Sequence, residues 1–272
     1  MADTPWSRDG AIEAYLDAVN GVLALARELT EVEWSAPTDL PVWTVFDNVA
    51  HVAAIEDELA GRPVPSTIHD WSQFPHVTTP FQQYTEVGVE ARRGQPPEEL
   101  VAELASLVEE RSRQLASAPE TPDAEMRGPA GMVGPVSRVM GTRTLDVWAH
   151  EQDIRRATGR APRMVGPAAE ASLRRMVDAL PIVVAQQAEA PTGTAVRVVV
   201  TGEPGAVVTV RVDDGGRGVR DDAADPDAVL ALDLERLQLL FCGRRPPGTV
   251  AVDVQGDPTL AERVISALAV TP

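Results

Sequence analysis

The stretch TRTLDVWAHEQDIRRATGR, from Thr142 to Arg160, has the residue spacing of one amphipathic helix. At 100° per residue, Asp146 and His150 lie one turn apart on its apolar side, with Cβ atoms expected about 5–6 Å from each other. That side also holds Val147, Ile154 and Ala157, and the opposite side holds Glu151, Gln152, Arg155 and Arg156. The spacing therefore predicts a carboxylate and an imidazole that point together into the interior.

A buried carboxylate without a partner costs several kcal/mol or loses its charge. A divalent cation removes this cost, because carboxylates and neutral imidazoles are both common metal ligands. Two structural alternatives stay open: Asp146 and His150 bond to each other, or Asp146 pairs with Arg143, three residues earlier. The D-x-x-x-H spacing alone does not choose among the three.

The composition of the 272 residues restricts the partners. There are 41 acidic residues against 24 basic ones, all arginine, for a net charge of −17. This balance repels phosphate backbones and anionic lipids, so we expect neither nucleic acid nor a membrane as partner. The segment MADTPWSRDG has neither the basic nor the apolar part of a signal peptide, which predicts a cytoplasmic protein. The single cysteine, Cys242, excludes an internal disulfide and a Cys-based zinc site and is interpreted as core packing.

The chain changes its pattern near residue 191. Residues 1–190 are predicted to form a helical bundle, and residues 191–272 a small α/β domain, so the fold class is α plus α/β. Helices are predicted at 7–30, 44–60, 80–93, 97–117, 142–160 and 167–189. In the second part, strands are predicted at 195–202, 206–214 and 249–256, and helices at 233–244 and 258–268.

A third metal ligand has to come from elsewhere in the chain, which contains four histidines. His51 lies in a predicted helix beside Asp47 and Glu58, away from the densest apolar arc, so periodicity predicts an exposed or rim position. His69 and His76 lie in the Pro-punctuated segment 61–79, where an exposed loop position is expected. Periodicity thus nominates no third ligand.

Two segments resemble the DinB-like family that includes mycothiol-dependent maleylpyruvate isomerases and related thiol transferases. They are WTVFDNVAHVAAIE, beginning at Trp43, and LDVWAHEQDIRRATGR, beginning at Leu145. The C-terminal part is similar to the sterol-carrier-protein-like domain often appended in this family, including its D-L-x-x-L-x-x-L-x-x-G-R helix at Asp233 to Arg244.

The resemblance implies a four-helix bundle holding one divalent metal through His51, Asp146 and His150. Zinc is preferred through the resemblance, although iron and nickel accept the same ligands. It also implies mycothiol as thiol cosubstrate and a small electrophilic substrate. For the assembly we expect a monomer or homodimer. One position differs: in the isomerases the carboxylate is commonly glutamate, and here it is the shorter Asp146.

Two histidines and one carboxylate leave coordination positions open, which is typical of a catalytic metal site. Such a site ionises a coordinated thiol, so we expect mycothiol to attack a small electrophile, giving isomerisation or S-transfer. The alternatives are a metal-dependent hydrolase and a non-catalytic protein that binds a small ligand.

A substrate with a carboxylate needs a cationic clamp. Arg244, in the segment FCGRRPPG, matches the G-R turn of the family and is the candidate. Its alternative role is to cap a helix C-terminus, which is worth about 0.3–1 kcal/mol. Trp43, Trp71 and Trp148 are candidates for a pocket wall, with core packing as the alternative.

Overall fold

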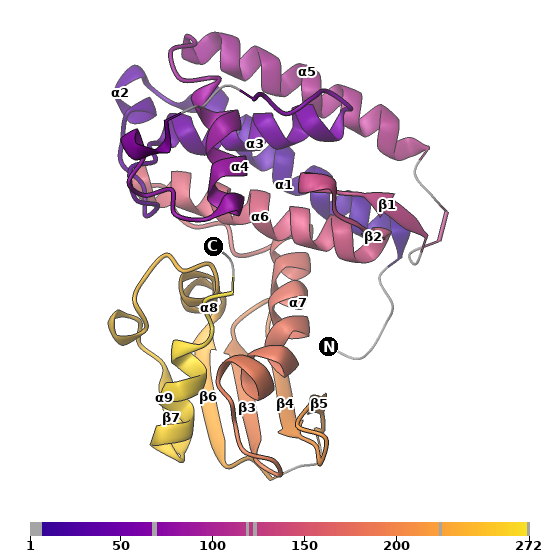
Figure 1. The fold of residues 1–272 in the computed structure, drawn as a ribbon, viewed down its shortest axis with the longest axis vertical. Coiled ribbons are helices and arrows are strands. Elements are labelled where there is room, and N and C mark those ends of the chain that lie inside the picture. The colour runs from indigo at the N-terminus through magenta and orange to yellow at the C-terminus, as the bar shows by residue number, and fades with distance from the viewer. Residues whose placement is uncertain (1–6, 67–69, 118–119, 122–123, 223–224, 271–272) are drawn as a thin grey trace. The chain divides into compact units, whose positions relative to one another are not determined.

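The structure is a computed structural model that describes residues 7–66, 70–117, 120–121, 124–222 and 225–270. The chain forms two compact units, which divide between Ala171 and Ser172. The N-terminal unit is helical and the C-terminal unit is α/β, as the sequence predicts (Figure 1). The predicted change of pattern near residue 191 lies just before the first strand of the C-terminal sheet, which begins at Ala195.

Four long helices form the core of the N-terminal unit. They are α1 (Arg8–Glu28), α3 (Val45–Leu59), α5 (Pro97–Ala116) and α6 (Val136–Ala157). Helix α1 packs along α6 and α5, and α3 packs against α5 and α6, so each helix contacts two neighbours of a four-helix bundle. The expected bundle is confirmed, and α3 and α6 are the pair that the metal-site hypothesis requires to be in contact.

Shorter elements connect the bundle helices. Helix α4 (Pro80–Glu90) crosses α3 (Figure 1). The others are α2 (Glu31–Trp34), the 3₁₀ turns η1 (Trp71–Gln73) and η2 (Pro129–Gly131), and the antiparallel strands β1 (Glu125–Arg127) and β2 (Val133–Pro135).

Helix α6 begins six residues earlier than its predicted start at Thr142, directly after β2. Proline and glycine, including Pro135 and Gly141, give segment 118–141 the composition of a loop. For this reason the sequence predicts too late a start for the helix. The structure buries Val136, Val139 and Met140 completely. Their burial holds the first turns of α6 in the bundle despite the low helix propensity of glycine.

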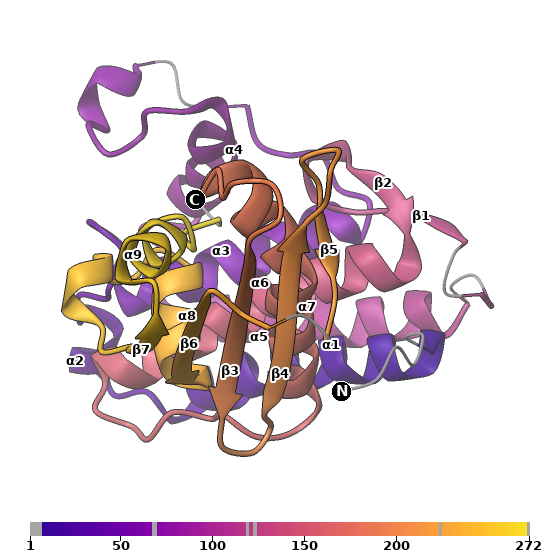
Figure 2. The same ribbon diagram turned by 90° about the horizontal axis from the view of Figure 1, so that it is seen from below.

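The C-terminal unit contains a five-stranded sheet in the order β5-β4-β3-β6-β7 (Figure 2). Strands β3 and β6 are parallel, and the other neighbours are antiparallel. The strands are β3 (Ala195–Thr201), β4 (Ala206–Val212), β5 (Gly218–Arg220), β6 (Ala228–Asp233) and β7 (Asp253–Gly256). The helical elements are α7 (Pro167–Ile182), which begins in the N-terminal unit, the π-helical turn η3 (Val183–Gln187), α8 (Leu234–Phe241), the 3₁₀ turn η4 (Pro247–Thr249) and α9 (Pro258–Ser266).

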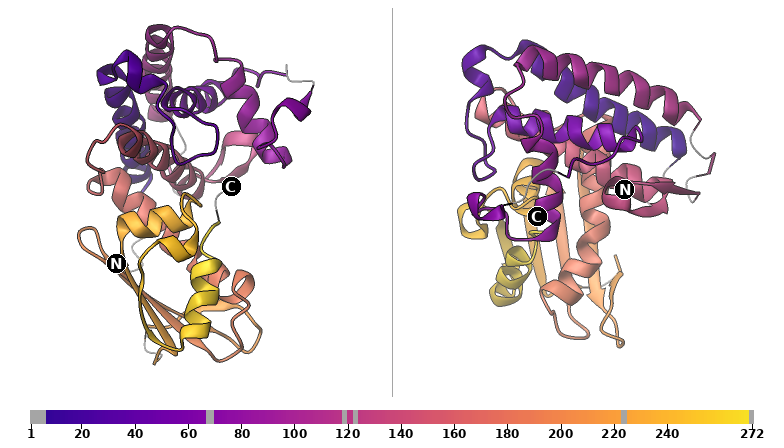
Figure 3. Two further views of the ribbon diagram at one scale, coloured as in Figure 1. Left: turned by 90° about the vertical axis from the view of Figure 1, so that its left-hand side faces the viewer. Right: turned by 45° about the horizontal axis from the view of Figure 1, so that its top comes forward.

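The central strands alternate between buried and partly exposed side chains. Val198 of β3 lies between Val208 of β4 and Leu230 of β6, and all three are buried. Their neighbours in sequence face the other side of the sheet, as the period of a strand requires. The C-terminal helices, drawn in yellow, lie on one side of the strands (Figure 3). The core of this unit is therefore a single layer of aliphatic residues between sheet and helices.

Strand β6 was not predicted from the sequence. No strand is predicted between residues 215 and 248, and the following helix is predicted to begin at Asp233. In the structure Asp233 ends β6, and its side chain accepts a hydrogen bond from the backbone N–H of Arg236 at the start of α8. None of the helices among the described residues has the length and apolar composition that a membrane span requires.

Candidate metal centre

A capping box fixes the start of helix α3. The Thr44 hydroxyl accepts from the backbone N–H of Asp47, and the Asp47 carboxylate accepts from the backbone N–H of Thr44 at 2.8 Å. This reciprocal pair satisfies two donors that the helix cannot satisfy internally. His51 follows about two helical turns after Thr44, so the box determines its position along the bundle.

Two side chains of α6 meet His51 across the bundle. Nε2 of His51 lies 3.5 Å from Oδ1 of Asp146, and Nε2 of His150 lies 3.5 Å from the same oxygen. The three potential ligand atoms lie within 4.8 Å of one another. In a tetrahedral site with ligands about 2.0–2.1 Å from zinc, neighbouring ligand atoms are separated by about 3.3–3.4 Å. The donor set therefore fits one metal ion.

The surroundings of His51 support the same interpretation. The ring is buried, with 4% of the residue exposed, and neither nitrogen has a hydrogen-bond partner in the part of the chain that the structure describes. Buried polar atoms are nearly always satisfied in native proteins, and an unsatisfied one costs about 1–3 kcal/mol. A metal ion supplies the missing partner for one of the two nitrogens. His150 is equally buried, with 5% exposed.

Two burial predictions were wrong. The sequence pattern placed His51 at the rim, but the polar face of α3 is engaged inside the protein: Asp47 binds Arg93, and the Tyr84 hydroxyl donates to Glu58. Asp146, predicted to be buried, leaves 38% of its side chain exposed. The site is thus closed around the imidazoles and open at the carboxylate.

The electrostatics of the site favour a neutral imidazole beside an ionised carboxylate. Burial lowers the pKa of His51 to about 4, although the neighbouring Asp146 acts in the opposite direction. Burial raises the pKa of Asp146, but the Arg143 guanidinium and the neighbouring His51 and His150 together outweigh this effect and hold the pKa well below its usual range. These are the protonation states in which both groups bind a metal.

Asn48 orients the second imidazole. Its Oδ1 lies 2.7 Å from Nδ1 of His150, and its amide nitrogen donates to the Thr44 carbonyl at 2.9 Å, which identifies Oδ1 as the acceptor facing the ring. Nδ1 of His150 therefore carries the proton and Nε2 presents its lone pair to the cluster. Asn48 was not nominated from the sequence. Its position one helical turn before His51 could have indicated that it lies at the same site.

An aromatic ring covers the imidazoles. The Trp43 ring lies 5.3 Å from the ring of His51 and 6.0 Å from that of His150. Its Nε1 donates to Glu86 at 2.9 Å, and Glu86 is also bound by His76 at 3.2 Å. Of the predicted pocket-wall residues, Trp43 lies at the site. His76 pairs with Glu86 and is not one of the three potential metal ligands, His51, Asp146 and His150.

The ion pair between Asp146 and Arg143 that the sequence left open is present. It coexists with the approach of both histidines, because Arg143 contacts Oδ2 and the histidines approach Oδ1. The pair and the metal hypothesis are therefore compatible.

Glu151 and Gln152 were predicted on the polar side of α6 but are fully buried. Glu151 pairs with Arg155 and Arg163, and Gln152 accepts from the backbone N–H of Arg163. The prediction from helical periodicity was wrong here, because both sides of α6 are buried and its polar side chains pair with other residues inside the protein.

The remaining candidates have other partners or lie outside the described residues. Arg244 is buried, with 7% exposed, and donates to the carbonyl of Cys242 at 2.6 Å, just after α8. This contact belongs to the capping role considered for it. Cys242 is buried as expected. Trp148 is buried too, with Nε1 bonded to the Arg163 carbonyl, and His69 lies outside the described residues.

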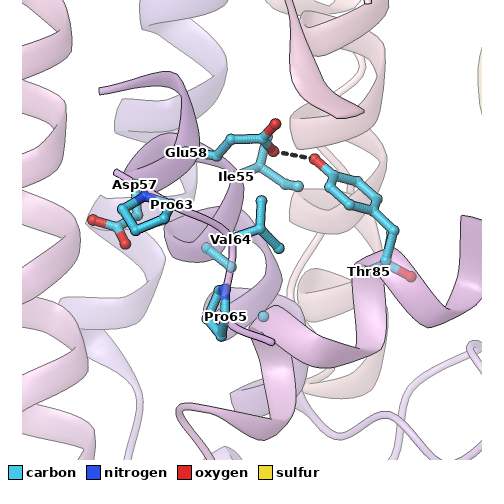
Figure 4. A pocket seen from close by; sticks show the side chains of 10 residues that line it. Ile55, Asp57, Glu58, Pro63, Val64, Pro65 and Thr85 are labelled. Carbon is cyan, nitrogen blue, oxygen red and sulfur yellow. Dashed lines mark hydrogen bonds between the residues drawn. The ribbon is translucent and has the colours of Figure 1, made fainter. Parts of the chain in front are cut away.

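A small depression lies one to two turns along α3 from His51. Ile55 and Glu58 line it from α3, Val64 and Pro65 from the following segment, and Thr85 from α4 (Figure 4). The dashed contact in the figure is the hydrogen bond from Tyr84 to Glu58.

The sequence matches two family models. One describes the mycothiol maleylpyruvate isomerase N-terminal domain and matches residues 15–155, which is more than half of the chain. The other describes the MDMPI C-terminal domain and matches residues 170–263. No curated protein matches the chain.

Two solved structures share the fold. One is a crystal structure of the mycothiol-dependent maleylpyruvate isomerase, with a TM-score of 0.58, 16% identity, and coverage of 93% of this chain and 94% of the other. The other is a histidine-to-alanine mutant of a mycothiol-dependent maleylpyruvate isomerase, with the same TM-score and identity, covering 92% and 94%.

Proposed function

The chain belongs to the mycothiol maleylpyruvate isomerase family, and on that premise we propose that it is a metal-dependent enzyme that uses mycothiol to isomerise a small electrophile of the maleylpyruvate type. The observation that carries the proposal is the approach of His51 and His150, each through Nε2, to a single oxygen of Asp146. The donor set contains no sulfur ligand, so the thiol has to come from the cosubstrate.

His51, Asp146 and His150 are the proposed ligands of one divalent metal, for which zinc is the first candidate. When bound, the metal acts as a Lewis acid that stabilises the thiolate form of a coordinated thiol. The free thiol has a pKa of roughly 8.5, so only a small part of it is ionised at neutral pH.

The protein's own groups prepare this chemistry by fixing proton positions and limiting water. His51 stays neutral at pH 7, because burial lowers its pKa to about 4. Asn48 holds the proton of His150 on Nδ1, away from the ligand atoms. Trp43 covers both rings from one side. The exposed part of Asp146 marks the side from which substrates enter.

The proposed reaction begins with addition of the thiolate to a carbon–carbon double bond conjugated with a carbonyl group. The electron pair of the double bond moves to the carbonyl oxygen, and the former double bond becomes free to rotate. Return of the electron pair expels the thiolate and leaves the rotated isomer, so no proton or electron is consumed. If a proton traps the adduct before expulsion, the net reaction is S-transfer.

We also propose Arg244 as the clamp for a substrate carboxylate, on the chemistry of its guanidinium and on its match to the G-R turn of the family. Arg244→Ala is then expected to raise KM with little change in kcat. The exposed neighbour Arg245 provides the matched control, and Arg245→Ala should leave KM unchanged.

The test combines metal content with turnover. Purified wild type is expected to carry about one divalent metal per chain and to isomerise maleylpyruvate when mycothiol is present, whereas His51→Ala and His150→Ala lose both properties. Loss of metal in either variant without loss of turnover would refute the metal-based proposal. Substrate consumption without mycothiol would identify a hydrolase, and accumulation of a stable thiol adduct would identify an S-transferase.

A further inference from the structure

The two oxygens of Asp146 have different partners. Oδ1 lies 3.5 Å from Nε2 of both His51 and His150. Oδ2 accepts a short hydrogen bond from NH1 of Arg143, which lies three residues earlier on α6. A carboxylate bound in this way has one oxygen available for a metal ion and the other engaged by the protein.

Arg143 is itself held in place. Its side chain is fully buried. Its Nε donates to Oε1 of Glu56 at 2.9 Å, and its NH2 forms an ion pair with the same oxygen at 2.8 Å. NH2 also donates to the backbone carbonyl of Val52 at 3.1 Å. A guanidinium is planar, so these contacts to α3 fix the direction of the NH1 group that reaches Asp146.

The negative charge of Glu56 compensates the positive charge of Arg143, which is buried beside the proposed metal site. The Glu56 side chain is fully buried, the Tyr15 hydroxyl donates to it, and Arg111 lies 3.6 Å away. An arginine next to a metal ion repels the ion, and Glu56 offsets this repulsion. The same carboxylate removes the cost of burying Arg143 unpaired.

We propose that Arg143, held by Glu56, is a positioning residue that fixes Asp146 as a one-oxygen metal ligand. The pair spans the same two helices as the ligands, since Glu56 lies on α3 and Arg143 on α6. It sets the carboxylate direction and keeps Oδ2 out of the coordination shell, which preserves open positions for substrates. This inference rests on the metal site of the proposed function but requires no particular reaction.

The test measures metal binding. The variant Glu56→Gln/Arg143→Met removes one negative and one positive charge, so the net charge near the site is unchanged. Loss of a partner that orients a ligand typically weakens metal binding about 10- to 100-fold. We expect a loss of this size in Zn²⁺ affinity, measured by competition with a chelator, and a Co²⁺ absorption spectrum like that of Asp146→Ala.

A double-mutant cycle tests whether Arg143 affects Zn²⁺ affinity through Asp146. If Arg143 acts through Asp146, adding Glu56→Gln/Arg143→Met to Asp146→Ala causes no further loss of Zn²⁺ affinity. Arg143→Lys keeps a positive charge and a donor, so it should lie between wild type and the double variant. It also serves as the second test if the double variant does not fold.

A partly buried ion pair elsewhere in the N-terminal unit provides the matched control. Arg92 donates to Glu103 at 3.0 Å, and neither residue is among the potential metal ligands. Arg92→Met/Glu103→Gln should lower thermal stability but leave Zn²⁺ affinity unchanged. The inference is overturned if Arg143→Lys and the double variant bind Zn²⁺ within about threefold of wild type, or if the control weakens binding equally. A wild type that binds Zn²⁺ but does not isomerise maleylpyruvate overturns the proposed function alone.

Discussion

Replacing His51 by leucine is expected to stabilise the metal-free protein. In the described part of the structure both ring nitrogens of His51 are buried without a hydrogen-bond partner. Each such atom costs about 1–3 kcal/mol relative to an apolar group of similar shape. Leucine has a comparable volume and no polar atom, so the variant should gain roughly 2 kcal/mol in free energy of unfolding when metal is absent.

Added metal should reverse the order of stability. A ligand that binds only the folded state at about 1,000 times its Kd stabilises it by about 4 kcal/mol. Wild type should receive this gain, and His51→Leu, with one of three ligands missing, much less. The assay is urea unfolding of both proteins, once with a chelator and once with excess Zn²⁺.

The control for this prediction is a histidine that has a partner. His76 lies 3.2 Å from Glu86, so His76→Leu should lose stability with or without Zn²⁺. A His51→Leu variant that is less stable than wild type in the chelator would contradict this prediction, because His51 would then be satisfied by interactions that leucine removes. Equal stabilisation of the variant and wild type by excess Zn²⁺ would contradict it as well.

Three further predictions follow from the site and its supports. In the unfolded chain His51 binds a proton below its ordinary pKa of 6.5, whereas in the folded, metal-free protein it does so only below a pKa of about 4. The free energy of unfolding should therefore fall by up to about 3 kcal/mol as the pH decreases from about 6.5 to about 4. His51→Leu should remove this part of the pH dependence in urea unfolding. Asn48→Leu should weaken Zn²⁺ binding about 10- to 100-fold, because it removes the hydrogen-bond acceptor for Nδ1 of His150. Asn48→Asp keeps an acceptor and should retain most of the affinity, measured by competition with a chelator. Gly21→Ala should cost about 1–3 kcal/mol in thermal unfolding without changing Zn²⁺ affinity, because the added methyl would lie 2.6 Å from the buried Glu151 carboxylate.

Helical spacing was sufficient to find the part of the site that lies on one helix. Asp146 and His150 are one turn apart, and a separation of four residues fixes their proximity without knowledge of the fold. His51 belongs to another helix, and periodicity placed it at the rim. Its inclusion depended on the resemblance to the family, because the contacts that bury the polar face of α3 come from other helices.

The supporting residues were harder to predict for the same reason. Asn48 and Glu56 both lie near His51 in sequence, but their partners His150 and Arg143 are on α6. A helical wheel treats polar residues as solvent-facing, and in this bundle several of them form buried networks. Strand β6 was missed on different grounds, since only Asp233 separates its short apolar run from the apolar residues of α8.

We propose that His51, Asp146 and His150 bind one metal ion together. X-ray absorption at the metal edge of the purified protein tests it most directly. We expect two imidazole nitrogens at about 2.0–2.1 Å and a carboxylate oxygen at about 2.0–2.2 Å, with a sulfur neighbour at about 2.3 Å after mycothiol is added. A spectrum with fewer than two imidazoles, or one that His51→Ala leaves unchanged, would contradict it.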